Sequence, residues 1–159
     1  MLDGVDVLFI DRVRSLRRSQ NTVDLDGRPG SRLPAYCTAV GKLLLASLPD
    51  FEQREALACT KTSKLGPNTI TSKRALREEL EQVRDSGFAV SDQEVAEGLC
   101  AMAAPVRDSG TEVVAAVGLV AHRGAISLEQ MVDALGPHLV ATADRISARL
   151  GYRRLDEQG

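Results

Sequence analysis

A thiol, an imidazole and a group of carboxylates are the side chains of this sequence whose types could perform catalysis. Cys37 comes just before an apolar segment that is typical of a helix, and a helix N-terminus lowers the pKa of a nearby thiol. His122 follows a strand-like segment and could act as the base that activates such a thiol. Residues 91–98, SDQEVAEG, hold three carboxylates that could bind a cation or exchange protons. One hypothesis is therefore a small hydrolase that uses Cys37 or the carboxylates of residues 92–97.

Structural roles for the same residues need fewer assumptions, and we favour them. Neither Cys37 nor His122 lies in a recognised nucleophile motif, and the carboxylates of residues 92–97 are typical of a solvated loop. The pair Gly41-Lys42 lacks the preceding glycines and the following Ser or Thr of a phosphate-binding loop. The three cysteines are widely spaced and form no CxxC pair, so we expect reduced thiols, no bound metal and no cofactor.

Composition and charge argue against several other classes of function. The chain has 159 residues, a length that fits one domain over residues 1–159. An aromatic content of 3% and a net charge of -2 do not fit a protein that stacks on bases or binds DNA phosphates. The first residues, MLDGVD, do not resemble a signal peptide, and no segment has the ~20 apolar residues that crossing a membrane requires. We therefore expect a cytoplasmic protein with no membrane partner.

Hydrophobic patterning predicts short strands towards both ends of the chain and helices between them. In chain order, the expected elements are strands 5–14 and 17–26, helices 39–48, 51–58 and 73–86, strands 88–91, 99–106 and 113–121, and a helix over 128–150. Thr38, Ser72 and Ser127 are expected to cap three of these helices. Gly136-Pro137 predicts a kink or a break in the last one. This order predicts an α+β fold with one largely antiparallel sheet and helices packed on both of its faces.

The two longest strands carry small residues where the sheet would face a helix. Segments 99–106 and 113–121 are apolar on both faces, which predicts central strands covered by helices. Small residues on them would leave space beside the sheet for a ligand, but Leu43, Leu44 and Leu45 of the buried helix could fill it. A pocket and a packed core are therefore both open at this point. The charges of helix 73–86, Glu79 among them, are typical of a solvated face.

One long motif resembles a known family. Residues 32–46, RLPAYCTAVGKLLLA, are similar to the LP-x-x-x-T-A-x-G-K-x-L-L-A signature of IclR-type transcriptional regulators. Further matches follow in the order and spacing of that family: TITS at 69–72, DQE-x-x-x-G at 92–98, AAPV at 103–106 and IS-x-x-LG at 146–151. The resemblance covers essentially the whole chain.

The resemblance implies a fold and a role. Members of the family join an N-terminal winged helix-turn-helix to a C-terminal effector-binding domain of GAF-like fold, and this chain resembles the second part only. It implies binding of a small-molecule effector, self-association as a homo-oligomer (a dimer or a tetramer), and contact with DNA only through the N-terminal domain. A ligand controls such a protein when it favours one quaternary arrangement over another. A GAF-like module that dimerises without a ligand is a further alternative.

The resemblance also implies a set of effector-binding residues between the sheet and the first buried helix. They are Leu25, Leu33, Ala39, Val40, Ser91, Ala101, Gly118 and Val120. The sequence departs from the family pattern at Ser91, where many relatives place an acid, and at residues 118–122, GLVAH in place of S-x-S-G-P. Cys100 precedes by one residue the position where relatives carry a cysteine, so it should face the other side of the strand. We therefore expect an effector that is larger and more apolar than a small carboxylate.

Overall fold

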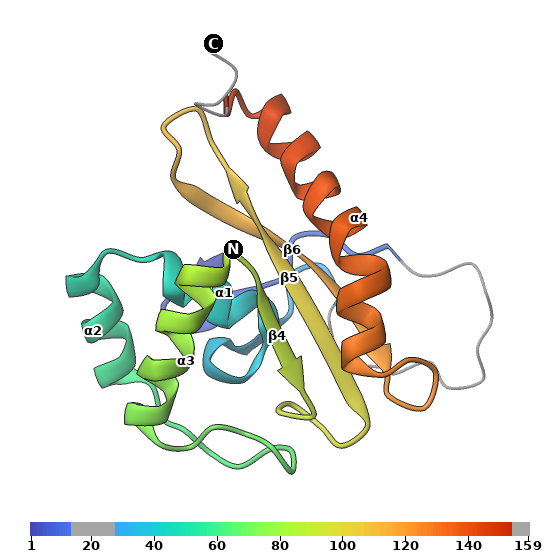
Figure 1. The fold of residues 1–159 in the computed structure, drawn as a ribbon. Helices are drawn as coiled ribbons and strands as arrows, with labels where there is room; N and C mark the ends of the chain where they lie inside the picture. The colour runs from blue at the N-terminus through green and yellow to red at the C-terminus, as the bar shows by residue number, and fades with distance from the viewer. Residues whose placement is uncertain (14–27, 154–159) are drawn as a thin grey trace.

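The structure is a computed structural model that describes residues 1–13 and 28–153 (Figure 1). Its strands are β1 (Leu2–Asp3), β2 (Asp6–Leu8), β3 (Arg32–Pro34), β4 (Ala89–Asp92), β5 (Leu99–Arg107) and β6 (Val113–His122). A 3-10 turn over Ala35–Cys37 precedes the helices α1 (Ala39–Ser47), α2 (Asp50–Cys59), α3 (Lys73–Ser86) and α4 (Leu128–Arg149). The predicted α+β class is confirmed, and so are all the predicted helices.

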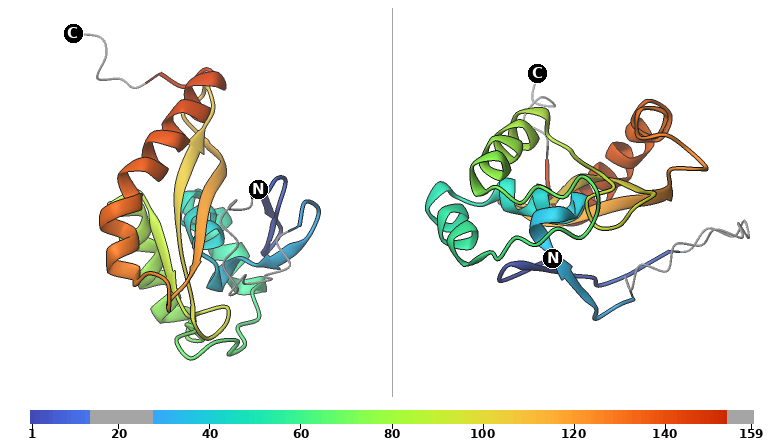
Figure 2. Two further views of the ribbon diagram at one scale, coloured as in Figure 1. Left: turned by 90° about the vertical axis from the view of Figure 1, so that its right-hand side faces the viewer. Right: turned by 90° about the horizontal axis from the view of Figure 1, so that it is seen from below.

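The described strands form two antiparallel sheets, in the orders β1-β2-β3 and β4-β5-β6, where the sequence predicted one. Figure 2 shows the layers that result: α4, the β4-β5-β6 sheet, α1, and then the β1-β2-β3 sheet. The β4-β5-β6 sheet thus has a helix on each face, as predicted. The strand predicted over 5–14 is shorter than expected: β2 spans only Asp6–Leu8, where it pairs with β3. The strand predicted over 17–26 lies outside the described residues.

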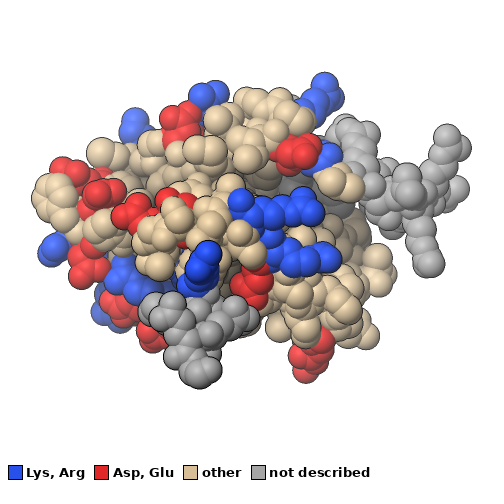
Figure 3. Space-filling model, turned by 90° about the horizontal axis from the view of Figure 1, so that it is seen from above, with Lys and Arg blue, Asp and Glu red and all other residues tan. Residues whose placement is uncertain are grey.

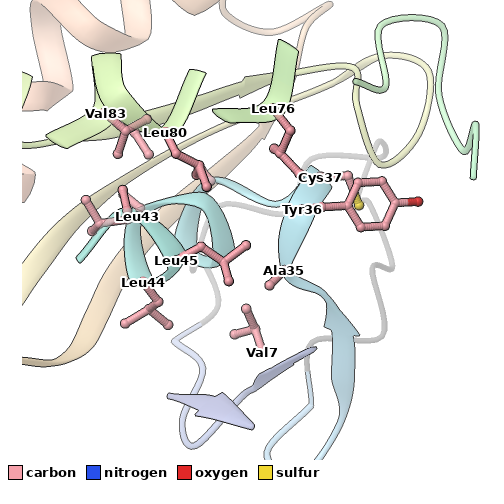
Figure 4. Packing of buried hydrophobic residues seen from close by; sticks show 14 of the residues in the cluster. Val7, Ala35, Tyr36, Cys37, Leu43, Leu44, Leu45, Leu76, Leu80 and Val83 are labelled. Atoms are coloured by element: carbon pink, nitrogen blue, oxygen red, sulfur yellow. The ribbon is translucent and has the colours of Figure 1, made fainter. Parts of the chain in front are cut away.

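Helix α1 is buried almost all round, as its sequence predicts. The Thr38 hydroxyl caps it by accepting a hydrogen bond from the Gly41 amide, and the helix ends before Pro49. Figure 4 shows its leucines between the stripe of Leu76, Leu80 and Val83 on α3 and Val7 of the small sheet. The described helices α2 and α3 lie to one side of α1 (Figure 1).

Helix α4 is continuous through Pro137, so the break that the sequence allowed there does not occur. Proline removes one backbone hydrogen bond from a helix interior. Here the buried side chains of Met131 and Leu139 anchor the helix on both sides of Pro137, and Gly136 packs against the Met102 methyl group of β5. We attribute the unbroken helix to this packing, which holds both halves against the same sheet.

Only one of the two long strands is covered as predicted. β5 is the central strand, and its side chains alternate between the α1 face (Ala101, Ala103) and the α4 face (Cys100, Met102). Cys100 therefore points away from Ala101, as the sequence predicted. β6 is an edge strand, and its Val120 side chain is 53% exposed, which corrects the prediction of a second covered strand.

The surface of the described part carries charges of both signs beside exposed hydrophobic side chains such as Phe51. On the face shown in Figure 3, Lys and Arg side chains are interspersed with Asp and Glu side chains. None of the described helices combines the length and the apolar character that crossing a membrane requires.

Candidate functional site

The sheet register brings four of the predicted site residues onto one face. Ser91 of β4 lies directly opposite Ala101 of β5, which lies opposite Val120 of β6. Gly118 lies in the neighbouring row, opposite Ala103. Because directly opposed residues of antiparallel strands point to the same side, both rows belong to the face that packs on α1.

The start of α1 lies over these two rows. A Cβ atom on Gly118 would lie 2.7 Å from Val40 Cγ1, so the helix approaches the strand as closely as a glycine permits. On β4, at the other side of the sheet from Gly118, the Ser91 hydroxyl donates a 3.0 Å hydrogen bond to the Cys37 carbonyl, just before the helix. The predicted residues Ala39 and Val40 thus lie next to the predicted residues of the sheet.

Two backbone amides at this helix start have no acceptor within α1. The Gly41 amide donates to Thr38 Oγ1 at 3.1 Å, and the Lys42 amide donates to the Thr38 carbonyl at 2.9 Å. The amides of Ala39 and Val40 precede them, at positions that no helix carbonyl can reach. Together with the positive end of the helix dipole, such amides suit a carboxylate or a carbonyl oxygen.

The row opens towards β6. Ser91 is 3% exposed, Ala101 is half-buried and Val120 is 53% exposed. The leucines of α1 pack against Ala103, so the packed-core alternative holds at that end of the face. At the Gly118–Val120 end the sheet is exposed to solvent.

Two predicted residues are not brought to this face by the described structure. Leu33 lies in the other sheet, directly opposite Val7, and is half-buried. Leu25 lies outside the described residues. Cavities of about 240 and 320 Å³ lie elsewhere, the first beside Tyr36 and the second between α4 and the start of β4.

A buried charged cluster was missed by the sequence interpretation. Lys42 is 1% exposed, and its Nζ lies 2.7 Å from Glu79 Oε1 and 2.6 Å from Glu94 Oε1. Glu79 was expected on a solvated face and residues 92–97 in a solvated loop; both expectations are wrong for these carboxylates. The signal was Lys42 itself, because a lysine in a helix that is apolar all round needs a buried partner. Asp92 is also paired, with Arg123 at 2.6 Å.

The thiol and carboxylates singled out for catalysis are poorly placed for it. Cys37 is fully buried, its thiol donates to the Pro34 carbonyl, and burial raises its pKa to about 12. The thiol is therefore protonated at neutral pH, whereas a nucleophilic cysteine reacts as a thiolate. His122 Nδ1 accepts a hydrogen bond from the Gly124 amide at the other end of the site. Within the described segments, no group of His, Cys, Asp and Glu side chains has the arrangement of a metal site.

The chain is similar to known proteins over most of its length. Residues 1–148 match the family described as Bacterial transcriptional regulator IclR C-terminal. The Pca regulon regulatory protein of Pseudomonas putida is 33% identical over 142 residues, which cover 89% of this chain and 48% of that protein. The chain spans about half the length of the curated relatives it matches.

Solved structures show the same fold. The putative transcriptional regulator RHA06195 from Rhodococcus sp. RHA1 superposes with a TM-score of 0.88 at 39% identity, over 94% of this chain and 58% of that one. The inducer-binding domain of the PobR transcription factor from Acinetobacter, a double mutant in complex with 3-hydroxybenzoic acid, has a TM-score of 0.83 at 28% identity, over 92% of this chain and 83% of that one. These relatives are transcriptional regulators and not enzymes. The chain therefore belongs to the IclR family of bacterial transcriptional regulators and corresponds to their GAF-like C-terminal domain.

Proposed function

We propose that this domain senses an aromatic or otherwise largely apolar carboxylic acid, bound where the start of α1 meets the exposed end of the β4-β5-β6 sheet. The proposal depends on one observation. The amides of Ala39 and Val40 lie beside a patch of the sheet made of Ala101, Gly118 and Val120. Such a site offers hydrogen bonds for one carboxylate and apolar contact for the remainder of the effector.

The floor of the site favours an apolar ligand over a small polar acid. Ser91 is the polar side chain of its row, and its hydroxyl is already engaged with the Cys37 carbonyl. A ring that buries about 100 Å² of apolar surface gains about 2.5 kcal/mol, and a two-carbon acid has almost no such surface. The 3-hydroxybenzoic acid held by the PobR inducer-binding domain supports an aromatic acid as the first candidate.

Calorimetry tests this effector class. We expect 3-hydroxybenzoate or a larger apolar acid to bind with a lower Kd than glyoxylate or pyruvate. Val120→Asp, which places a carboxylate in the exposed row, should abolish binding by repelling the carboxylate of the effector. Val114→Asp is the matched control, since Val114 is exposed on the same strand six residues away, roughly 20 Å along it. Tight binding of glyoxylate alone, or equal affinity in the two variants, would contradict the proposal.

In the whole regulator, we propose that the effector changes DNA binding by favouring one homo-oligomeric arrangement. A ligand shifts such an equilibrium only by the difference between its affinities for the two arrangements. The test uses the full-length protein: operator binding and molecular mass by light scattering, each with and without the acid found by calorimetry. An effector that binds this domain but changes neither quantity would leave the domain as an assembly module, which is the alternative reading.

A further inference from the structure

The charged cluster beneath the start of α1, here the Lys42 cluster, consists of Lys42, Glu79 and Glu94. It joins three elements: Lys42 belongs to α1, Glu79 to α3, and Glu94 to the turn after β4. The side chains of Lys42 and Glu94 are 1% and 8% exposed, and that of Glu79 is 24% exposed. An ion pair buried to this degree is retained only with close hydrogen bonds, which the 2.6 and 2.7 Å contacts provide.

The charges and hydrogen bonds of this cluster do not balance. Two carboxylates share one ammonium group, and Glu94 Oε2 is a buried oxygen without a hydrogen-bond partner among the described residues. A buried carboxylate oxygen without a donor is unfavourable, and a proton on the carboxyl group removes both the charge and the deficit. In agreement, burial raises the pKa of Glu94, and the Lys42 ammonium opposes this rise only in part.

The cluster is connected to the candidate effector site along the chain. Lys42 lies three residues after Ala39, in the first turn of α1. Glu94 follows β4 closely, and β4 also provides Ser91, which holds the Cys37 carbonyl. The Glu94 carbonyl in turn accepts a 2.6 Å hydrogen bond from the Thr69 hydroxyl, which fixes the turn. The start of α1 is therefore held at two points by the end of β4 and the turn after it.

The charged and titratable groups around Glu94 come from each neighbouring element. They are Lys42 on α1, Glu79 on α3, Asp92 on β4 with its partner Arg123, and Cys37 just before α1. The charge of Glu94 contributes, after burial, to the raised pKa of Cys37. Because Glu94 contacts Lys42 in the first turn of α1, its charge lies close to the helix start, where an effector carboxylate would lie.

We propose that the Lys42 cluster positions the start of α1 for the effector, and that a proton gained at Glu94 strengthens the binding of a carboxylate there. The inference rests on the proposed function for its ligand. With Glu94 ionised, the cluster carries a net negative charge beside the effector carboxylate. With Glu94 protonated, that charge is gone while Lys42 keeps its contact with Glu79. Affinity for an anionic effector should therefore rise as the pH falls.

The first experiment measures the Kd of 3-hydroxybenzoate between about pH 5.5 and 8, above the pH at which a carboxylic acid of the ligand becomes protonated. We expect the affinity of the wild-type domain to rise by up to about tenfold per pH unit across part of this range, the limit for uptake of one proton. Glu94→Gln, which resembles the protonated form, should bind tightly at every pH. Glu78→Gln is the matched control, because Glu78 lies next to Glu79 on α3 but pairs with the exposed Arg74. If Kd depends on pH equally in the wild type and in Glu94→Gln, the proton is not bound at Glu94 and this part of the proposal is overturned.

The second experiment needs no ligand and tests the positioning role. In a Cys59→Ser background, two buried thiols remain on opposite faces of the sheet: Cys37 at the start of α1 and Cys100 beneath α4. We expect Lys42→Met to increase the alkylation rate of Cys37 by at least tenfold relative to Cys100, as measured by peptide mass spectrometry. Glu79→Gln should give a smaller increase of the same kind, and it decides the question if Lys42→Met does not fold.

The two experiments separate the two proposals. If no variant binds 3-hydroxybenzoate at any pH while Cys37 becomes selectively reactive, the effector assignment fails and the positioning role stands. If Cys37 and Cys100 become equally reactive in both variants, Lys42 is a general structural residue and the positioning role is overturned.

Discussion

The two faces of the β4-β5-β6 sheet are covered by one helix each, yet they are built in different ways. On the α4 face, Cys100, Met102 and Ala104 pack against Met131 and Leu139. On the α1 face, the sheet presents alanines and a glycine, and the helix brings uncapped amides and a buried lysine. The α4 face combines an apolar core with the cavity of about 320 Å³ beside α4, whereas the α1 face combines a core with polar groups and an exposed edge. We therefore expect α4 to stabilise the domain and α1 to be the element that meets the proposed effector.

The largest effect should come from the α4 face. Met131→Ala removes a fully buried side chain between α4 and β5 and should lower the free energy of unfolding by about 2–5 kcal/mol. Urea denaturation measures this loss, with the exposed Asp133→Ala on the same helix as the control. Effector affinity at a temperature where the variant is folded should remain unchanged. A large change in effector affinity would contradict the expectation that the two faces have different roles.

A smaller loss is expected where α1 touches the sheet. Gly118→Ala would place a methyl group 2.7 Å from Val40 Cγ1, and such overpacking lowers stability by about 1–3 kcal/mol. Effector binding should weaken as well, because the displaced side chain lies at the site. Val40→Ala should restore the stability of Gly118→Ala, since it removes the opposing methyl group. If Val40→Ala does not restore stability, the contact between the added methyl group and Val40 is not the cause of the loss.

The pH dependence of stability distinguishes the faces in a further way. The pKa of Glu94 is raised in the folded protein, mainly by burial, so its protonated form favours folding below its unfolded pKa. That contribution is lost as the pH rises through the folded pKa, at about 1.4 kcal/mol for each unit of pKa difference. The free energy of unfolding should therefore fall over this window in the wild type and stay flatter in Glu94→Gln. If the free energy of unfolding depends on pH in the same way in both proteins, Glu94 is not the cause of that dependence.

The smallest effect concerns two helix caps with the same chemistry. Thr38→Ala and Ser72→Ala each remove a side chain that accepts a hydrogen bond from the first turn of a helix, and each should cost about 1 kcal/mol of stability. Only Thr38→Ala should also weaken effector binding, since Thr38 orders the helix start at the site. Thermal unfolding and calorimetry on the same two variants provide the comparison.

Local signals in the sequence account for most of the fold. The caps at Thr38, Ser72 and Ser127 all depend on neighbouring residues, and each is confirmed. The short strand β3 and the division into two sheets were missed, because a three-residue strand has no periodic pattern to detect.

The site was predictable only in part, for a related reason. Ser91, Ala101, Gly118 and Val120 came from the resemblance to a family, and the register confirms that they share a face, while their role in binding remains a prediction. The partners of Lys42 lie 37 and 52 residues away in the chain, so no local pattern could reveal them. Long-range ion pairs are visible only once the elements have been brought together.

The position of α1 between two sheets also limits how the molecule can move. A sheet lies on each side of the helix, and seven of its nine residues are buried. Displacing the helix outward would open both interfaces at once. The ion pairs of Lys42 with Glu79 and Glu94, and the hydrogen bond from Ser91 to the Cys37 carbonyl, also resist movement of its first turn along the helix axis. The first turn of α1 is therefore fixed in position by its neighbours on every side that the structure describes.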